Sequence, residues 1–255
     1  MSHSFANERV LITGATRGLG LSIVKGLVPR GAQVTIIARS QTRTSDAECA
    51  GASVISGDAT NESLMLAVVA DIRPSVLILN AGATPFMAPI DEQTWETFSR
   101  IWNNDVRAGF YGIQAALKTP LLPGSRVLLT LSGAALHGAP LSGGLAGAKR
   151  ELWFMAQYAN DVARERQLGI QFQALLPMQM IIETALAQEI AEAYARRQRV
   201  SIETLLTSRY GNVTLSADQY GEYVAAILAD PKYASAVALG IKGDTGISQL
   251  DKSTA

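Results

Sequence analysis

Residues Val10 to Gly20, VLITGATRGLG, have the composition and spacing of a phosphate-binding loop. A short apolar run, too short for a helix, precedes Gly14, Gly18 and Gly20, and a helical pattern follows. Glycines allow a sharp turn and the close approach of a pyrophosphate. The free N–H groups and positive dipole end of the next helix would face that phosphate. The spacing G-x-x-x-G-x-G is not the usual G-x-G-x-x-G fingerprint, and the alternative is an ordinary turn. The flanking strand and helix favour nucleotide binding.

The elements that must position this loop alternate regularly between strand and helix. Continuous apolar strands between helices predict an α/β fold of the doubly wound Rossmann type, a parallel sheet with helices on both faces, in a single domain. The expected strands are 10–12, 33–38, 53–56, 75–79, 126–131, 171–176 and 237–241. The expected helices are 19–27, 62–70, 91–117 with a break near Asn103, 145–166, and 216–228 with a capping box of Ser216 and Gln219.

Residues 182–213 interrupt this alternation. They contain two consecutive helical patterns, at 183–197 and 201–209, and no strand. We expect them over the carboxyl edge of the sheet, where ligands bind in such folds, and interpret them as a substrate lid. A surface helical pair that only supports packing is the alternative.

Composition limits the classes of partner. The 22 basic and 22 acidic residues give no net charge, which argues against nucleic acid or an anionic membrane as the main partner. No apolar stretch approaches the length of a membrane span, and the first ten residues lack a signal-peptide core. The single cysteine, Cys49, excludes an internal disulfide and has no neighbouring metal-ligand pattern. We therefore expect a cytoplasmic protein without a metal site.

Several motifs, in this order, resemble those of the short-chain dehydrogenase/reductase family over nearly the whole chain. Residues 13–20 resemble its T-G-x-x-x-G-x-G cofactor loop, and Asn80-Ala81-Gly82 its N-A-G motif. Asp58 resembles its adenine-contacting aspartate, Ser132 its catalytic serine and Lys149 the lysine of Y-x-x-x-K. The resemblance implies a nicotinamide cofactor. The residues it implies around that cofactor are Gly14, Thr16, Arg17, Gly18, Leu19, Gly20, Asp58, Ala59, Asn80, Ala81, Gly82, Lys149 and Pro177.

Charges after the second strand favour NADP(H) over NAD(H). An acidic residue about 20 residues beyond the glycine loop would bind the ribose 2′-hydroxyl of NAD. This chain has Arg39 and Ser40 there instead, and both can donate hydrogen bonds to a 2′-phosphate. Arg17 adds a second positive charge. Either arginine alone can be a solvated surface residue, but the pair without an acid predicts NADP(H).

The position of the family's catalytic tyrosine holds Leu145. It lies four residues before Lys149 and thirteen after Ser132, which are the intervals that the family uses. We expect no nearby tyrosine to replace it, because Tyr158 is more than three turns further along the helix. Because general acid catalysis contributes roughly 10²- to 10⁴-fold in rate, this chain can bind cofactor while reducing carbonyls slowly or not at all.

Two further positions depart from the family pattern. Asp105 takes the place of an asparagine, where it could accept hydrogen bonds from water or Lys149, or could be a helix-break residue satisfied by backbone N–H groups. Met178 replaces the glycine that often follows Pro177 and would lie near the nicotinamide. His137, after the fifth strand, is a candidate proton donor, although a pocket wall or surface role is the commoner one for a lone histidine.

Three functions remain open from the sequence. The first is an NADP(H)-dependent oxidoreductase for a hydrophobic ketone or alcohol, with His137, Ser132 or a held water replacing the tyrosine. The second is a non-redox catalyst, such as a cyclase, isomerase or dehydratase, in which Asp105 could also act. The third is a disabled cofactor-binding form, natural or engineered. A small hydrophobic substrate is expected from one set of apolar residues: Leu145, Met178, Met180, Ile181 and Ile182.

The helix expected at 145–166 carries apolar residues around much of its circumference, including Leu152, Trp153, Phe154, Met155 and Tyr158. A helix that is apolar all round should be buried. In the resembling family this helix often packs against a symmetry mate, so we expect a homodimer or homotetramer. Burial within the monomer is the alternative.

Overall fold

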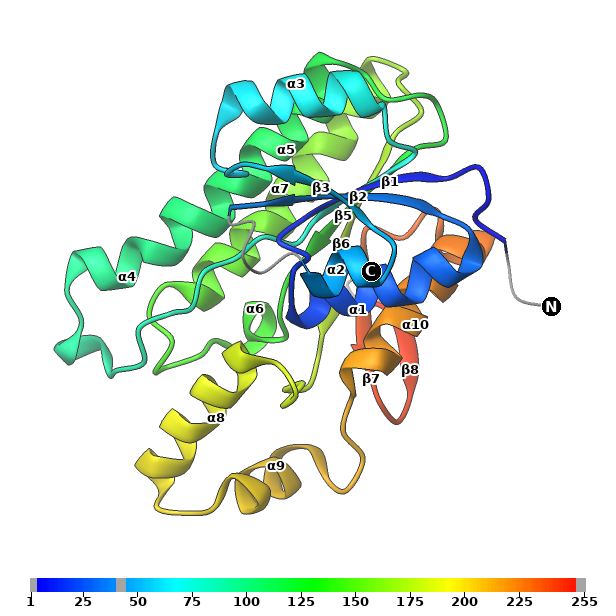
Figure 1. Cartoon of the computed structure of the whole chain (residues 1–255). Coiled ribbons are helices and arrows are strands. Elements are labelled where there is room, and N and C mark those ends of the chain that lie inside the picture. Colours follow the sequence, from blue (N-terminus) through cyan, green and yellow to red (C-terminus); the bar gives the residue numbers. More distant parts are fainter. Residues whose placement is uncertain (1–3, 40–44, 251–255) are drawn as a thin grey trace.

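The computed structural model describes residues 4–39 and 45–250, and an eight-stranded sheet lies at its centre (Figure 1). The strand order is β3-β2-β1-β4-β5-β6-β7-β8, and every neighbouring pair is parallel except β7 and β8. The strands are β1 (Arg9–Thr13), β2 (Gln33–Ala38), β3 (Ser53–Ser56), β4 (Val76–Leu79), β5 (Arg126–Thr130), β6 (Gln171–Pro177), β7 (Ala238–Lys242) and β8 (Gly246–Gln249). The predicted doubly wound α/β fold is confirmed.

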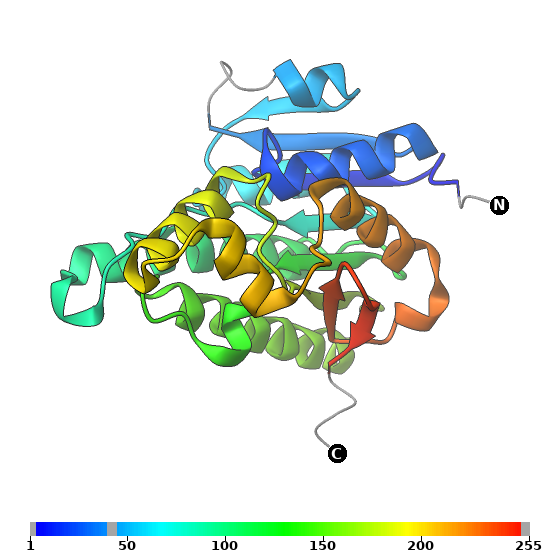
Figure 2. The same cartoon turned by 90° about the horizontal axis from the view of Figure 1, so that it is seen from below.

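Helices cover both faces of this sheet (Figures 1 and 2). The α-helices are α1 (Gly18–Leu27), α2 (Ser45–Cys49), α3 (Glu62–Ile72), α4 (Trp95–Ile101), α5 (Arg107–Lys118), α6 (Ala134–His137), α7 (Leu145–Glu165), α8 (Ala185–Gln198), α9 (Ile202–Tyr210) and α10 (Ala217–Ala229). Short 3₁₀ segments are η1 (Val28–Arg30), η3 (Ile90–Glu92) and η5 (Pro231–Tyr233). Helices α1 and α10 pack on one face, and α3, α5 and α7 on the other.

Strand pleating divides the buried residues between two cores. In β1, Ile12 belongs to the core beneath α1 and α10, whereas Leu11 belongs to the core beneath α3, α5 and α7. Successive side chains of a strand point to opposite faces, so a strand covered on both sides must be apolar at every position. This is why the strands near the sheet centre are continuous apolar runs.

Two sequence expectations require correction. Residues 237–241 are not the last strand, because β8 follows and pairs antiparallel with β7. Strand β8 is a partly buried edge strand without a continuous apolar run, so its sequence does not predict a strand. The helix expected from residue 91 begins only at Trp95, where Thr94 supplies a capping box with Thr97.

The predicted break near Asn103 is a one-turn π-helix, η4 (Trp102–Val106), between α4 and α5. Wider turns of this kind occur mainly at functional sites. In this chain the widened turn contains Asp105, which is almost fully buried. The irregularity therefore places a carboxylate inside the protein.

Helices α8 and α9 lie against each other, outside the layered sheet (Figure 2). Gln179 connects their segment to the sheet edge, since its side chain donates to the Val213 carbonyl at 2.9 Å and accepts from the Gly243 N–H at 2.8 Å. The sequence-based interpretation of 182–213 as a lid stays a prediction.

Within the described ranges, no helix combines the length and apolar character needed to cross a bilayer. The cytoplasmic location stays a prediction.

Close packing of α1 on α10 holds the helix that follows the glycine loop. A Cβ added at Gly26 would lie 2.7 Å from the Gly221 carbonyl oxygen, and one at Gly221 would overlap the Ser22 carbonyl oxygen. The two backbones approach so closely that only glycine fits at the crossing.

We therefore expect Gly221→Ala to lower the free energy of unfolding by about 1–3 kcal/mol, because the added methyl group must push α10 away from α1. Urea denaturation measures this. Ala226→Ser, on the exposed side of the same helix, should change stability by less than about 0.5 kcal/mol. Equal effects from the two variants would contradict the packing argument.

Candidate functional site

A cavity of about 1310 Å³ lies at the carboxyl ends of the parallel strands. Its wall includes the glycine loop, the ends of β2 to β6, the N-terminus of α7 and parts of α8 and α9. Ligand pockets usually have volumes of about 300–1,000 Å³, so this cavity has room for a dinucleotide and a second molecule. Carboxyl-end crevices are where open α/β sheets bind ligands.

The glycine loop forms one end of this cavity. Gly14 and Gly18 adopt positive φ angles of 69° and 58°, which favour glycine. Arg17 precedes α1 without a capping side-chain hydrogen bond, and the first turn of α1 has no acidic residue. The free N–H groups at this helix end are therefore available to a phosphate.

Gly20 does not line the cavity, contrary to the expected contact with cofactor. It is buried behind the loop, where an added Cβ would lie 2.6 Å from Ala15 Cα and 2.7 Å from Asn80 Nδ2. Its glycine requirement comes from backbone packing within the loop.

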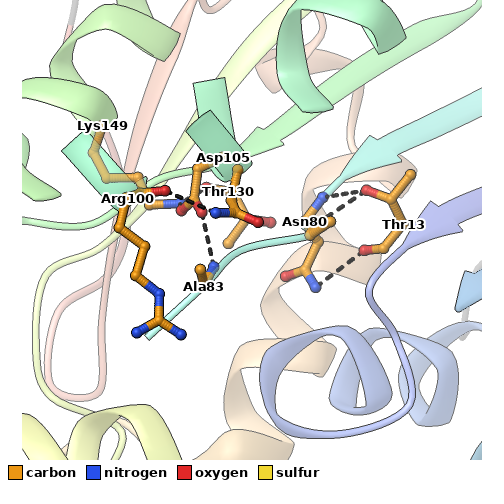
Figure 3. A network of polar contacts seen from close by, with 9 residues as sticks. Thr13, Asn80, Ala83, Arg100, Asp105, Thr130 and Lys149 are labelled. Carbon is orange, nitrogen blue, oxygen red and sulfur yellow. Dashed lines mark hydrogen bonds and ion pairs between the residues drawn. The ribbon is translucent and has the colours of Figure 1, made fainter. Parts of the chain in front are cut away.

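Thr13 and Asn80 tie the glycine loop to the end of β4 (Figure 3). The Thr13 hydroxyl accepts from the backbone N–H groups of Asn80 and Ala81, both at 3.1 Å. The Asn80 amide donates to the carbonyl oxygens of Gly14 at 2.8 Å and Thr13 at 3.3 Å. Both NH₂ hydrogens of Asn80 are thereby used within the protein, and its part in the site is to shape the loop.

Arg39 and Asp58 lie at the end of the cavity beside β2 and β3. Arg39 is exposed and lines the cavity, whereas Ser40 lies outside the described residues. Asp58 lines the cavity too, and its Oδ1 accepts from the backbone N–H and hydroxyl of Thr60, both at 2.8 Å. These bonds fix the carboxylate at the cavity wall.

At the opposite end, Ser132, Leu145 and Lys149, which the family resemblance assigns to one site, all line the cavity. The Ser132 hydroxyl accepts from the Ala134 N–H at 3.2 Å, which leaves its own O–H free to donate into the cavity. Leu145 begins α7 and is 4% exposed. It belongs to a small apolar cluster with Ile101 and Ala148, on which Ile190 of α8 also packs.

Lys149 forms a buried ion pair with Asp105 (Figure 3). Its Nζ lies 2.9 Å from Asp105 Oδ2 and donates to the Thr130 carbonyl at 3.2 Å. Asp105 Oδ1 accepts from the Ala83 N–H at 2.8 Å. The two alternatives for Asp105 are therefore both realised, since it pairs with the lysine and also accepts from the backbone.

The number of N–H donors on Lys149 determines how many hydrogen bonds it can still donate to a ligand. An ammonium has three N–H donors, and Asp105 and the Thr130 carbonyl receive two of them. Lys149 lines the cavity, so the third donor is available to a ligand. The neighbouring carboxylate also balances the lysine's positive charge at the site.

The apolar side of the cavity differs slightly from the expected one. Met178, Met180, Ile181 and Leu145 line it, but Ile182 does not, because it packs with the cluster around Leu141 and Tyr194. Pro177 ends β6 at the cavity, and exposed His137, the last residue of α6, also lines it.

Sequence reasoning missed residues that α8 and α9 bring to this site. Tyr194 and Tyr210 line the cavity, so the expectation that no other tyrosine is near needs correction. Arg209 lines it as well. These residues are 45 or more positions after Leu145, and no local spacing rule connects them to it. Only the fold of the 182–213 segment brings them together.

A nicotinamide dinucleotide fits the residues present. The uncapped N-terminus of α1 and the backbone of Gly14 and Gly18 would hold the pyrophosphate, and Arg39 would lie at the ribose beyond it. Lys149 and Ser132 would lie at the nicotinamide end. When bound, such a cofactor donates or accepts a hydride.

Known proteins resemble this chain in sequence and in fold. The model of the family described as short chain dehydrogenase matches residues 8–195. L-xylulose reductase of Bos taurus is 31% identical over 110 residues, which cover 42% of this chain and 45% of that protein, so the match spans less than half of this relative.

Two solved structures share the fold at low sequence identity. A variant of actinorhodin polyketide ketoreductase with NADPH has a TM-score of 0.76 at 23% identity, covering 94% of this chain and 98% of that one. NAD⁺-bound xylitol dehydrogenase has a TM-score of 0.77 at 20% identity, covering 94% and 99%.

Removing one partner of the buried ion pair should be costly. We expect Asp105→Ala to lower the free energy of unfolding by about 3–5 kcal/mol, because Lys149 then stays buried without a counter-charge. Asp105→Asn combined with Lys149→Met should recover part of this loss. Urea denaturation measures both variants.

The exposed pair of Lys118 and Glu62, 3.0 Å apart, is the matched control. Glu62→Ala should lower stability by no more than about 1 kcal/mol. If Asp105→Ala lowers the free energy of unfolding by no more than Glu62→Ala does, the buried ion pair is not needed for stability.

Proposed function

Because the chain belongs to the short chain dehydrogenase family, we propose that it is an NADP(H)-dependent oxidoreductase for a hydrophobic ketone or alcohol. One observation carries the proposal. One cavity joins the uncapped N-terminus of α1 to the Ser132 and Lys149 side chains. Family membership supports a nicotinamide cofactor, and the apolar wall around Leu145 and Met178 supports a hydrophobic substrate.

Arg39 supports the preference for the phosphorylated cofactor. It is the residue directly after β2, where NAD-specific proteins place an acid, and it lines the cavity. Arg17 lines the same end. Two guanidinium groups favour a 2′-phosphate, which carries negative charge and accepts forked hydrogen bonds.

The carbonyl end of the cavity offers donors other than a tyrosine. Ser132 can polarise a carbonyl oxygen through its free O–H, and the third N–H of Lys149 can do the same. His137 lines the same cavity, and its imidazole ring can donate or accept a proton. A held water is a further possible donor. These groups would take over the proton transfer that the missing tyrosine performs in the family.

Leu145 and the ion pair also favour a second candidate, a non-redox catalyst such as a cyclase, isomerase or dehydratase. Leucine makes the wall apolar, and Asp105 compensates the charge of Lys149, so neither feature is suited to ionising a phenol. In this second function Ser132 polarises the substrate while His137 or Asp105 moves the proton. A cofactor-binding form without turnover is the third possibility.

Aromatic side chains on α5 and α7 support the proposed homodimer or homotetramer. Leu152 and Trp153 are buried within the chain, but Tyr158 is 58% exposed and Phe110 of α5 is 45% exposed. Tyr158 stacks on Phe154 with ring centroids 6.3 Å apart. A second copy of the chain could cover these rings.

Arg39→Ala should weaken NADPH binding by about 10- to 100-fold, because a charge-assisted pair with the 2′-phosphate is lost. NADH binding should change little, since NADH lacks this phosphate. Fluorescence titration of both cofactors measures the difference. Arg166→Ala, at the far end of α7, should leave both affinities unchanged; equal loss of NADPH and NADH binding by Arg39→Ala would refute the assignment.

Leu145→Tyr tests whether the reaction is redox. With a panel of apolar ketones, we expect this variant to oxidise NADPH about 10²- to 10⁴-fold faster than the wild type, because it restores a proton donor beside Lys149. NADPH absorbance follows the reaction. Circular dichroism must show that the larger side chain leaves the fold intact.

The wild-type protein distinguishes the second candidate function. Product that forms without any change in NADPH absorbance would support a cyclase, isomerase or dehydratase. Tight NADPH binding with no turnover by either protein would exclude the proposed reduction of these ketones.

A further inference from the structure

The cavity has an arginine on its lid side, and we propose that Arg209 binds a carboxylate carried by an otherwise apolar substrate. Arg209 lies in the last turn of α9 and lines the cavity with α8. The inference rests on the proposed function in one respect, because it takes this part of the cavity as the place of the substrate.

Arg209 is an exposed side chain whose guanidinium group lies over an immobilised ring. Its guanidinium carbon lies 4.4 Å from the ring centroid of Tyr194. Tyr194 is 7% exposed, and its hydroxyl accepts from the Leu141 N–H at 3.3 Å. The ring also packs among Leu205 and Ala191. A stacked, pre-oriented guanidinium loses less conformational freedom on binding than a free side chain does.

Stacking leaves the hydrogen-bonding edge of Arg209 free. A guanidinium has five N–H donors in its plane and contacts the ring through its face. Among residues 4–39 and 45–250, Arg209 has no carboxylate within 4.0 Å and donates no hydrogen bond to protein. By contrast, Lys149 in the same cavity is already paired with Asp105.

The surroundings define the class of ligand. Helix α8, on which Arg209 stacks, contributes Leu186 and Ile190 to the same cavity, and Met180 lines it as well. A planar carboxylate matches the forked donors of a guanidinium. A ligand with one carboxylate and an apolar body would bind Arg209 through the carboxylate and the apolar wall through its body. Arg17 and Arg39 lie at the glycine-loop end, where the cofactor phosphates are proposed. Of the other basic residues on the wall, Lys149 is paired with Asp105, and Lys242 at the end of β7 lacks a planar fork, so Arg209 is the residue that matches a carboxylate on the substrate.

Octanoate and octanamide are matched probes, because they have the same length and differ in charge. We expect calorimetric titration to show at least about tenfold tighter binding of octanoate to the wild type, as charge-assisted hydrogen bonds are the stronger ones. Arg209→Gln should remove this preference while octanamide binding persists. Arg209→Lys should retain only part of it, since an ammonium lacks the planar fork.

Arg197→Gln is the control, because Arg197 is exposed on α8 and does not line the cavity. Its octanoate affinity should equal that of the wild type. The proposal is overturned if octanoate does not bind at millimolar concentration, if the wild type binds both probes equally, or if Arg209→Gln keeps the preference. Equal loss of both probes in that variant would also overturn it, because it would indicate a disturbed lid.

An NADPH titration of the same proteins separates this inference from the proposed function. Arg209→Gln should bind NADPH as the wild type does. A wild type that prefers octanoate through Arg209 but does not bind NADPH would refute the cofactor assignment and leave the carboxylate site standing. Normal NADPH binding without any octanoate preference would refute the carboxylate site alone.

Discussion

The buried pair of Lys149 and Asp105 is the constraint that the centre of this protein must satisfy. Two charges removed from water require close pairing and additional hydrogen bonds, or the cost of their desolvation is not recovered. Four separate parts of the chain meet this requirement: α7 supplies the lysine, the π-turn supplies the carboxylate, β5 supplies the Thr130 carbonyl and the segment after β4 supplies the Ala83 N–H. Their relative positions are fixed at the place where a reaction would occur.

The two ends of the cavity have diverged to different degrees from the family pattern. At the glycine-loop end, the positive φ angles of Gly14 and Gly18 and the hydrogen bonds of Thr13 and Asn80 give the loop the shape expected of a phosphate-binding loop. At the other end, Leu145 stands where the resemblance places the family's tyrosine, and it is packed into an apolar cluster with Ile101 and Ala148. The proposed cofactor binding therefore rests on intact features, whereas the chemistry depends on the groups that surround the leucine.

The segment of α8 and α9 adds what the sheet alone does not provide. Gln179 joins it to the sheet edge, and the Tyr194 hydroxyl joins it to the loop before α7. Through these contacts the segment brings an arginine, two tyrosines and apolar residues to a cavity whose other walls come from strand ends. Substrate choice in the proposed function would depend on this segment more than on the geometry of the sheet.

The sequence by itself determined the doubly wound sheet, the glycine loop and the one-turn separation of Leu145 and Lys149, whereas Ser132 was placed beside them by the family resemblance. The first three features depend on local rules: strand pleating requires continuous apolar runs, glycine spacing sets the loop, and one helical turn separates residues 145 and 149. Antiparallel β8 escaped these rules because an edge strand needs no apolar run.

Only the tertiary structure decided that Asp105 pairs with Lys149, that Gly20 lies behind the loop, and that Tyr194 and Arg209 reach the cavity. Residues 105 and 149, or 145 and 194, are far apart in the chain. Their contacts depend on how a π-turn and a helical pair pack against the sheet, and no sequence period encodes that packing.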